Sequence, residues 1–214
     1  MKPILFSTPM VQALLNIKPG TWPAEPIDSS RPCKSQTRRV VEDPPCRLEA
    51  QSRYRYDGMC NEPDSDDAGC HYMEELTADG EPTEKYFNIG KARYQAGDRL
   101  WVRETFYDGD MQGKMIYRAD GEHDCDGVWK PSIHMPREAA RLFLEVREVR
   151  VERLQDICHE GVTAEGIQQK ECGCEVVTGG YCTVFREFWN AVNGKGAWES
   201  NPWVFVYEFM RVEG

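Results

Sequence analysis

The chain has 214 residues, of which 40% are apolar and 11% aromatic, enough for one globular domain with a hydrophobic core. Its formal charge of −10 excludes binding to a long nucleic-acid duplex unless the basic residues gather on one face. No stretch reaches the roughly 18–20 apolar residues that a membrane helix needs, and the N-terminus lacks a signal-peptide core, so we expect a cytoplasmic protein without membrane contacts.

The N-terminal region alternates between regular structure and chain breakers. Pro3–Phe6 is a short apolar stretch typical of a strand. Ser7 or Thr8 then provides an N-cap for a helix that Pro9 opens. Residues 17–33 contain four prolines and a glycine, which predicts an irregular insertion.

A strongly acidic segment follows. Residues 57–84 contain ten acidic side chains and no lysine or arginine. This composition buries little apolar surface, so we expect a second, mostly irregular insertion over residues 42–93. Because the acidic segment accounts for the whole net charge, the remaining chain is neutral and compatible with a local basic patch.

The second half of the chain is rich in predicted strands. Residues 97–106 alternate in the manner of a strand, and the residues from Met115 are expected to form its hairpin partner. Residues 141–154 give the clearest strand signature, and the closing stretch of residues 201–212 is typical of a strand buried on both faces. Helices are expected over residues 154–166 and 183–192. Strands with few short helices predict an α+β fold, in the form of a compact mixed β-barrel.

Five segments in this order resemble the ASCH domain of the PUA-like superfamily, in the variant common in bacteriophages and prophages. They are "ILFSTPMVQALLN", "KSQTRRVV", "YQAGDRLWVRETF", "RVERLQDICHEGVTAEGI" and "NPWVFVYEF". The similarity covers roughly residues 1–16, 34–41 and 94–211. It implies a single PUA-like domain over residues 1–214, a small β-barrel with short flanking helices and two irregular insertions, and an association with RNA or modified nucleosides.

Some small members of this family are amidohydrolases that remove the acetyl group from N4-acetylcytidine, using a Lys-x-x-Thr pair and a later glutamate. The resemblance implies that Lys34 and Thr37 are that pair and that Glu165 is the glutamate. A threonine hydroxyl needs a base, and a lysine can serve when burial or a nearby arginine lowers its pKa. Glu165 would either donate a proton to the leaving nitrogen or hold Lys34 in place.

Four further residues are candidates for contacting the substrate: Arg38, Arg39, Arg103 and Glu104. Because adjacent strand residues face opposite sides, we expect only one of the two neighbouring arginines to face the pocket of Lys34. Trp101 lies on the same predicted face as Arg103, and a tryptophan there is core more often than a platform for a base. The plainer alternative is that the basic residues of "KSQTRRVV" form a solvated strand end.

We expect no cofactor, with a structural zinc ion as the open alternative. Cys158, Cys172, Cys174 and Cys182 provide enough thiolates for one site, although Cys-x-Cys is not the usual zinc-knuckle spacing. A second set consists of Cys46, Cys60, Cys70 and His71, whose spacing is long and irregular.

Three functional hypotheses follow. The protein is an amidohydrolase on N4-acylated cytidine, a non-catalytic module that binds RNA or a modified base, or a phage accessory protein that binds a host protein. The first requires Lys34, Thr37 and Glu165 to meet in one pocket.

Overall fold

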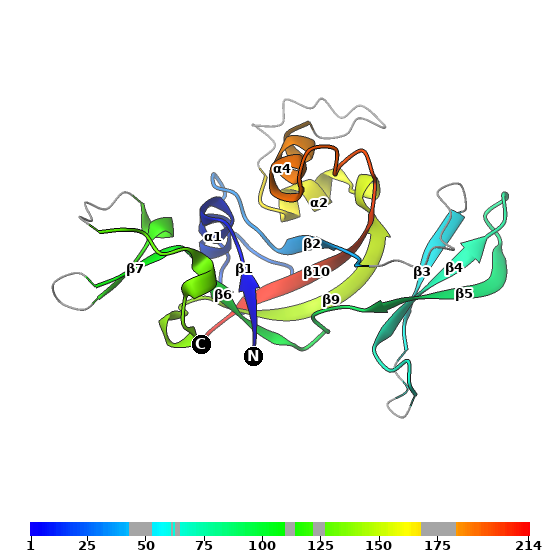
Figure 1. Cartoon of the computed structure of the whole chain (residues 1–214), viewed down its shortest axis with the longest axis horizontal. Coiled ribbons are helices and arrows are strands. Elements are labelled where there is room, and N and C mark those ends of the chain that lie inside the picture. Colours follow the sequence, from blue (N-terminus) through cyan, green and yellow to red (C-terminus); the bar gives the residue numbers. More distant parts are fainter. Residues whose placement is uncertain (43–52, 61, 63–64, 110–113, 122–126, 168–182) are drawn as a thin grey trace.

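The computed structural model describes residues 1–42, 53–60, 62, 65–109, 114–121, 127–167 and 183–214. These residues form an α+β fold in which a five-stranded, a three-stranded and a two-stranded sheet are combined with short helices (Figure 1). The predicted fold class is therefore confirmed at the level of α+β. Among the strand pairings of the described residues no closed barrel is found, and the predicted barrel stays a prediction. No described helix has the length and apolar character to cross a membrane.

The five-stranded sheet forms the centre of the molecule. Its strands lie in the order β1-β6-β9-β10-β2, with β1 and β6 parallel and the other neighbours antiparallel. The bounds are β1 Lys2–Leu5, β6 Arg99–Arg103, β9 Phe143–Arg153, β10 Trp203–Val212 and β2 Gln36–Val40. The strands predicted at the N-terminus, at residues 97–106, at residues 141–154 and at the C-terminus are all confirmed.

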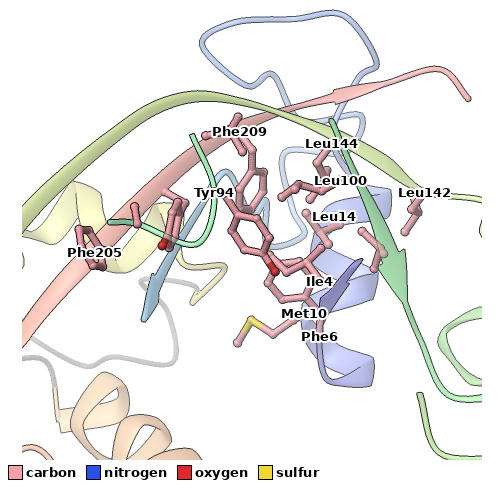
Figure 2. Close-up of a cluster of buried hydrophobic side chains, with 14 of the residues drawn as sticks. Ile4, Phe6, Met10, Leu14, Tyr94, Leu100, Leu142, Leu144, Phe205 and Phe209 are labelled. Carbon is pink, nitrogen blue, oxygen red and sulfur yellow. The ribbon is translucent and has the colours of Figure 1, made fainter. Parts of the chain in front are cut away.

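Strand β10 is buried on both faces, as its sequence predicted. Phe205, Tyr207 and Phe209 belong to one buried cluster, whereas Val204 and Val206 belong to another. This division follows from the alternation of side chains along a strand. The first cluster includes Ile4, Leu14, Leu100 and Leu144, which Figure 2 shows between the sheet and the first helix.

Helices lie on both faces of the central sheet. The helix α1 (Thr8–Leu15) packs Met10 and Leu14 into the first cluster, with Ser7 at its N-cap as expected. The helices α2 (His159–Ala164) and α4 (Thr183–Asn193) supply the second cluster and lie together over β2 and β10 (Figure 1). The predicted helix over residues 154–166 is interrupted: a 3-10 turn precedes α2. The 3-10 turns are η1 Arg118–Asp120, η2 Ser132–His134, η3 Arg137–Ala139 and η4 Leu154–Asp156.

Residues 17–33 form no helix or strand beyond a single bridge between Ile17 and Pro26, so the first insertion is irregular as predicted. Asn16 holds it in place. Its Nδ2 donates to the carbonyl oxygens of Asp28, Arg31 and Pro32 at 2.8, 3.2 and 3.1 Å, and its Oδ1 accepts from the Asp28 amide at 2.8 Å.

The prediction of an irregular second insertion is wrong. It contains a three-stranded antiparallel sheet, seen projecting from the body in Figure 1: β3 Arg53–Met59, β4 Cys70–Leu76 and β5 Pro82–Lys91. Met73 and Ile89 are buried in the first cluster, while Arg55 pairs with Glu74 and Lys85 with Glu75 across the strands. Acidic composition masked this pattern, because cross-strand ion pairs and a few buried side chains suffice to hold a sheet to the core.

The expected partner of β6 also differs. The strand β8 (Met115–Tyr117) pairs with β7 (Phe106–Asp108) in a separate two-stranded sheet. The chain leaves the central sheet after Arg103, where the Glu104 carboxylate turns inward to Arg141. The hairpin with Met115–Tyr117 is therefore formed by Phe106–Asp108, after the strand of the central sheet has ended.

Candidate functional site

A cavity of about 170 Å³ lies at the edge of the central sheet, where β2 ends the strand order. Its buried polar lining comes from β2, from Lys34 two residues before β2, and from Glu165 at the end of α2. The rest of its wall comes from the start of the chain and from α4. The lining includes Phe6, Ser7, Met10, Lys34, Thr37, Arg38, Arg39, Glu165, Phe188, Trp189, Val192 and Asn193.

Lys34 is positioned by backbone contacts on either side of it. Its amide donates to the carbonyl of Ala13 at 3.3 Å, it forms a bridge with Glu165, and the next amide, of Ser35, donates to Ala164 at 2.8 Å. Lys34 thus lies outside β2, between the ends of α1 and α2. Gly166 has a φ of +89°, and a Cβ there would come within 3.2 Å of the Lys34 and Ala13 Cβ atoms. Glycine therefore permits both the turn and the close approach.

Lys34 and Glu165 form a buried ion pair. The Lys34 Nζ donates to Glu165 Oε2 at 2.7 Å and to the Glu165 backbone carbonyl at 3.0 Å, although the two residues are 131 positions apart. Their side chains are 1% and 4% exposed. The Phe6 ring centre lies 5.5 Å from the same ammonium, so the charge is enclosed by one carboxylate and an aromatic face.

Arg38 connects this pair to the sheet. Its Nη1 donates to Glu165 Oε1 at 3.0 Å, while its Nε and Nη2 donate to Glu152 Oε1 at 2.9 and 2.7 Å. Glu165 therefore has a cation on each oxygen, and Arg38 has a carboxylate on each side. Such mutual pairing is what allows charges to be buried.

Thr37 receives its hydrogen bond from Arg39. The Arg39 Nη1 donates to Thr37 Oγ1 at 2.7 Å and to the Arg38 carbonyl at 2.8 Å, and Nη2 donates to the Leu5 carbonyl at 3.3 Å. Thr37 is 2% exposed. Since its oxygen accepts from a guanidinium, its own O–H remains available to another acceptor.

The expectation that only one of the adjacent arginines faces the cavity is wrong, because Arg38 and Arg39 both line it. The strand assignment is nevertheless right, since β2 includes both residues. β2 is an edge strand, so a long side chain from one face can fold around its free edge. Arg39 does so, as its bond to the neighbouring carbonyl of Arg38 indicates.

The surroundings lower the pKa of both partners of the ion pair. Burial lowers the pKa of the Lys34 ammonium below its ordinary 10.5, and the charges of Arg39 and Arg38 add to this, while Glu165 opposes it. Burial alone would raise the pKa of the Glu165 carboxyl, but Lys34, Arg38 and Arg39 outweigh it and hold that pKa below its usual value. Glu165 is therefore a carboxylate, which favours a role in holding Lys34 over a role as a proton donor.

Two predicted substrate-binding residues, Arg103 and Glu104, do not line this cavity. The Arg103 guanidinium carbon lies 4.7 Å from the ring centre of Trp101, which is 5% exposed and part of the core rather than a platform for a base. Glu104 is buried and receives two bonds from Arg141, at 2.9 and 2.8 Å. These residues serve the packing around β6 instead.

Several wall residues escaped the sequence prediction. Phe188, Trp189 and Val192 lie at helical spacing in α4, and that pattern indicated only a core-facing stripe. Glu152 lies in β9 at a position whose alternation indicated a solvated face, yet it binds Arg38. Only knowledge of which strand ends beside which helix would have identified these residues.

The zinc hypothesis is largely untested. Cys46, Cys172, Cys174 and Cys182 lie outside the described residues. Among the residues that the structure does describe, no group of three or more histidine, cysteine or acidic side chains is placed to hold a metal ion. Cys158 is an exposed free thiol, and Cys60 and Cys70 are free as well.

The chain matches no protein-family model, no curated protein and no solved structure. The function therefore has to be argued from the cavity itself.

Proposed function

We propose that the protein is an ASCH-type amidohydrolase with a PUA-like fold that removes an acyl group from N4-acylated cytidine or a closely related substrate. The observation that carries the proposal is the meeting of Lys34, Thr37 and Glu165 in one cavity from distant parts of the chain. Amide hydrolysis needs a nucleophile, a base and a donor for the oxyanion, and Thr37, Lys34 and Arg39 are residues of the types that supply them.

Thr37 is the nucleophile and neutral Lys34 is its base. A neutral amine has two N–H bonds and one lone pair, and Lys34 already directs two bonds at Glu165, to Oε2 and to the carbonyl oxygen. Loss of one proton therefore leaves the lone pair for the Thr37 hydroxyl. Guanidinium groups do not lose a proton in proteins, whereas the pKa of Lys34 is lowered by burial, so Lys34 is the group of this cluster that can act as a base.

The reaction has two halves. In the first, the Thr37 oxygen forms a bond to the acyl carbon as its proton passes to Lys34, and the C–N bond breaks as Lys34 returns that proton to the leaving nitrogen. In the second, a water molecule attacks the ester carbon while giving a proton to Lys34. Lys34 passes that proton to the Thr37 oxygen as the C–O bond breaks, which releases the carboxylic acid and free Thr37. Arg39, which is bonded to the Thr37 oxygen, is the donor nearest to the developing oxyanion.

The proposal is tested by incubating the purified full-length chain with N4-acetylcytidine and a panel of N4-acylated cytosines while following release of the free amine by chromatography. Rapid acid quenching followed by mass spectrometry should detect a chain that carries one acyl group on the peptide containing Thr37. Hydrolysis of one panel member together with that adduct supports the proposal. Absence of turnover across the panel would refute it.

One observation favours the non-catalytic alternative, in which the cavity only binds a modified base. Among the hydrogen bonds of the described residues, Lys34 is engaged with Glu165 and Thr37 with Arg39, so nucleophile and base are each bonded elsewhere. In that case N4-acetylcytidine should bind with saturation, measured by calorimetry, and be recovered intact. The third hypothesis, binding to a host protein, stays a prediction.

A further inference from the structure

The cavity wall contains a hydrogen-bond donor that the proposed reaction does not use. Trp189 of α4 is 4% exposed and lines the cavity, and its indole Nε1 is buried without a hydrogen-bond partner in the described structure. Of the buried side-chain atoms in that condition, it is the one whose residue lines this cavity. The others belong to Gln36, His71, Arg103 and Trp203. Burying an N–H group without a hydrogen-bond partner costs free energy, so we expect a bound ligand to supply the missing acceptor.

Among the described residues, no acceptor of the wall forms a hydrogen bond with this donor. Lys34 and Arg38 bind Glu165, Arg39 binds Thr37, and Phe6 and Met10 present apolar surface. The other polar lining residues, Ser7 and Asn193, are exposed. A ligand that fills the cavity must therefore bring the acceptor itself, on a part that is otherwise flat and apolar enough to lie against Phe188 and Val192.

The acyl oxygen of a substrate is not the best candidate for that acceptor. It has to lie beside the Thr37 hydroxyl, where the Arg39 guanidinium already provides a charged donor. The heterocycle attached to the leaving nitrogen carries a second oxygen, and the Trp189 Nε1–H is a buried donor of the cavity wall that has no hydrogen-bond partner among the described residues. An indole N–H is a donor only. It can therefore bind a ring that presents an oxygen or an unprotonated nitrogen at that position, but not a ring that presents an N–H there.

We propose that Trp189 is a specificity-determining residue whose Nε1–H donates to a hydrogen-bond acceptor on the substrate's heterocycle, so that the cavity selects acylated amines of pyrimidine-like rings over simple anilides. This inference rests on the proposed function for its substrate class. It adds that recognition of the ring comes from α4, an element that carries none of the reacting groups.

Binding to an inactive chain tests the inference apart from catalysis. The Thr37→Ala chain is labelled with ¹⁵N, and its indole N–H signals, from six tryptophans, are recorded with N4-acetylcytosine and with acetanilide. The signal absent from the additional Trp189→Phe variant identifies Trp189. That signal should move downfield with N4-acetylcytosine and not with acetanilide, which has the same acetyl group and a flat ring without an acceptor.

Trp203→Phe provides the matched control. Trp203 also has a buried, unpartnered Nε1, but it packs beside Tyr54 outside the cavity. Trp189→Phe should weaken binding of N4-acetylcytosine by roughly 3- to 10-fold, the loss expected for one neutral hydrogen bond, while Trp203→Phe leaves it unchanged.

The two proposals fail in different ways. If the wild-type chain hydrolyses N4-acylcytosines while the Trp189 signal stays in place at saturating ligand, this inference is overturned and the proposed function stands. If the signal moves with N4-acetylcytosine alone and no hydrolysis occurs, the inference holds and the cavity is a binding site. A signal that does not respond to N4-acetylcytosine at any concentration, or equal shifts with both ligands, overturns the inference.

Discussion

The Arg39 guanidinium donates a hydrogen bond of 2.7 Å to the hydroxyl oxygen of Thr37, two residues earlier on the same strand. The bond fixes the side chain of the proposed nucleophile and leaves its proton available. It also places a permanent positive charge beside the oxygen that would become negative during proton transfer. Substitutions at Thr37 and at Arg39 should therefore have different effects, because the first removes the proposed nucleophile and the second removes the neighbouring charge.

Thr37→Ala should abolish amide hydrolysis, with kcat reduced by about 10³-fold or more, because the proposed nucleophile is removed. Loss of one acceptor for Arg39 should cost about 1 kcal/mol of unfolding free energy, since the guanidinium keeps its two backbone partners. Steady-state kinetics and urea denaturation measure the two effects. Thr37→Ser, which keeps a hydroxyl, should retain substantial activity, and full activity in Thr37→Ala would remove Thr37 from the mechanism.

Arg39→Gln should move the pH dependence of activity. Lys34 must lose a proton to act as a base, so kcat/KM should rise through a pKa that lies below the 10.5 of an ordinary lysine. The positive charge of Arg39 lowers the pKa of Lys34, so its removal should shift this rise toward higher pH and also reduce the maximal rate. Arg39→Lys keeps the charge and should leave the position of the rise nearly unchanged. Identical profiles for all three chains would contradict a Lys34 base.

Lys34 and Glu165 should be strongly coupled in stability. Lys34→Met leaves the buried Glu165 carboxylate with Arg38 as its remaining cation, and Glu165→Gln leaves Lys34 without a counter-charge. Each should cost roughly 2–4 kcal/mol in unfolding free energy. The double variant should cost less than the two single variants combined, by about 1–3 kcal/mol.

The exposed pair of Lys18 and Glu25, whose side chains are 52% and 60% exposed, provides a control for that cycle. Water and salt screen such a pair, so the same cycle on it should give a coupling near zero. Equal coupling in the two cycles, measured by chemical denaturation, would mean that the buried pair contributes no more than a surface contact.

The buried His71 should make the fold sensitive to acid. Its Nδ1 lies 2.7 Å from the Tyr56 hydroxyl, which itself donates to the Val149 carbonyl, while Nε2 is buried without a partner among the described residues. Burial lowers the pKa of His71 to about 4 from 6.5. Protonation therefore favours the unfolded chain, so this contribution is fully present above pH 6.5 and is lost as the pH falls toward 4.

The loss attributable to His71 should amount to at most about 3 kcal/mol. Urea denaturation between pH 7 and pH 4 should show it in the wild-type chain and a flatter profile in His71→Gln. His134→Gln, at an exposed position, should keep the wild-type slope. If His71→Gln loses stability with acid as steeply as the wild type, another group is responsible.

Local patterns predicted the elements of the central sheet and its helices because each has a strong periodicity of its own, as in β9 and α4. The small sheet of β3, β4 and β5 was missed because its buried residues, such as Met73 and Ile89, are few among many acidic ones. The meeting of Lys34 with Glu165 was expected from the family resemblance alone. Glu152 and Trp189 were not found, since their contacts depend on which elements become neighbours in space.

The position of β2 in the central sheet has a consequence for the order in which the molecule folds. In the described sheet, β2 has β10 as its neighbour, and the register joins Thr37 to Tyr207 near the opposite end of the chain. Until β10 has emerged from the ribosome, β2 lacks this partner strand, so the cavity walls cannot assemble before residues 203–212 are available. Contacts of such sequence separation form slowly. The central strands β1, β6 and β9 can pair before that moment, and completion of the cavity should coincide with the docking of β10.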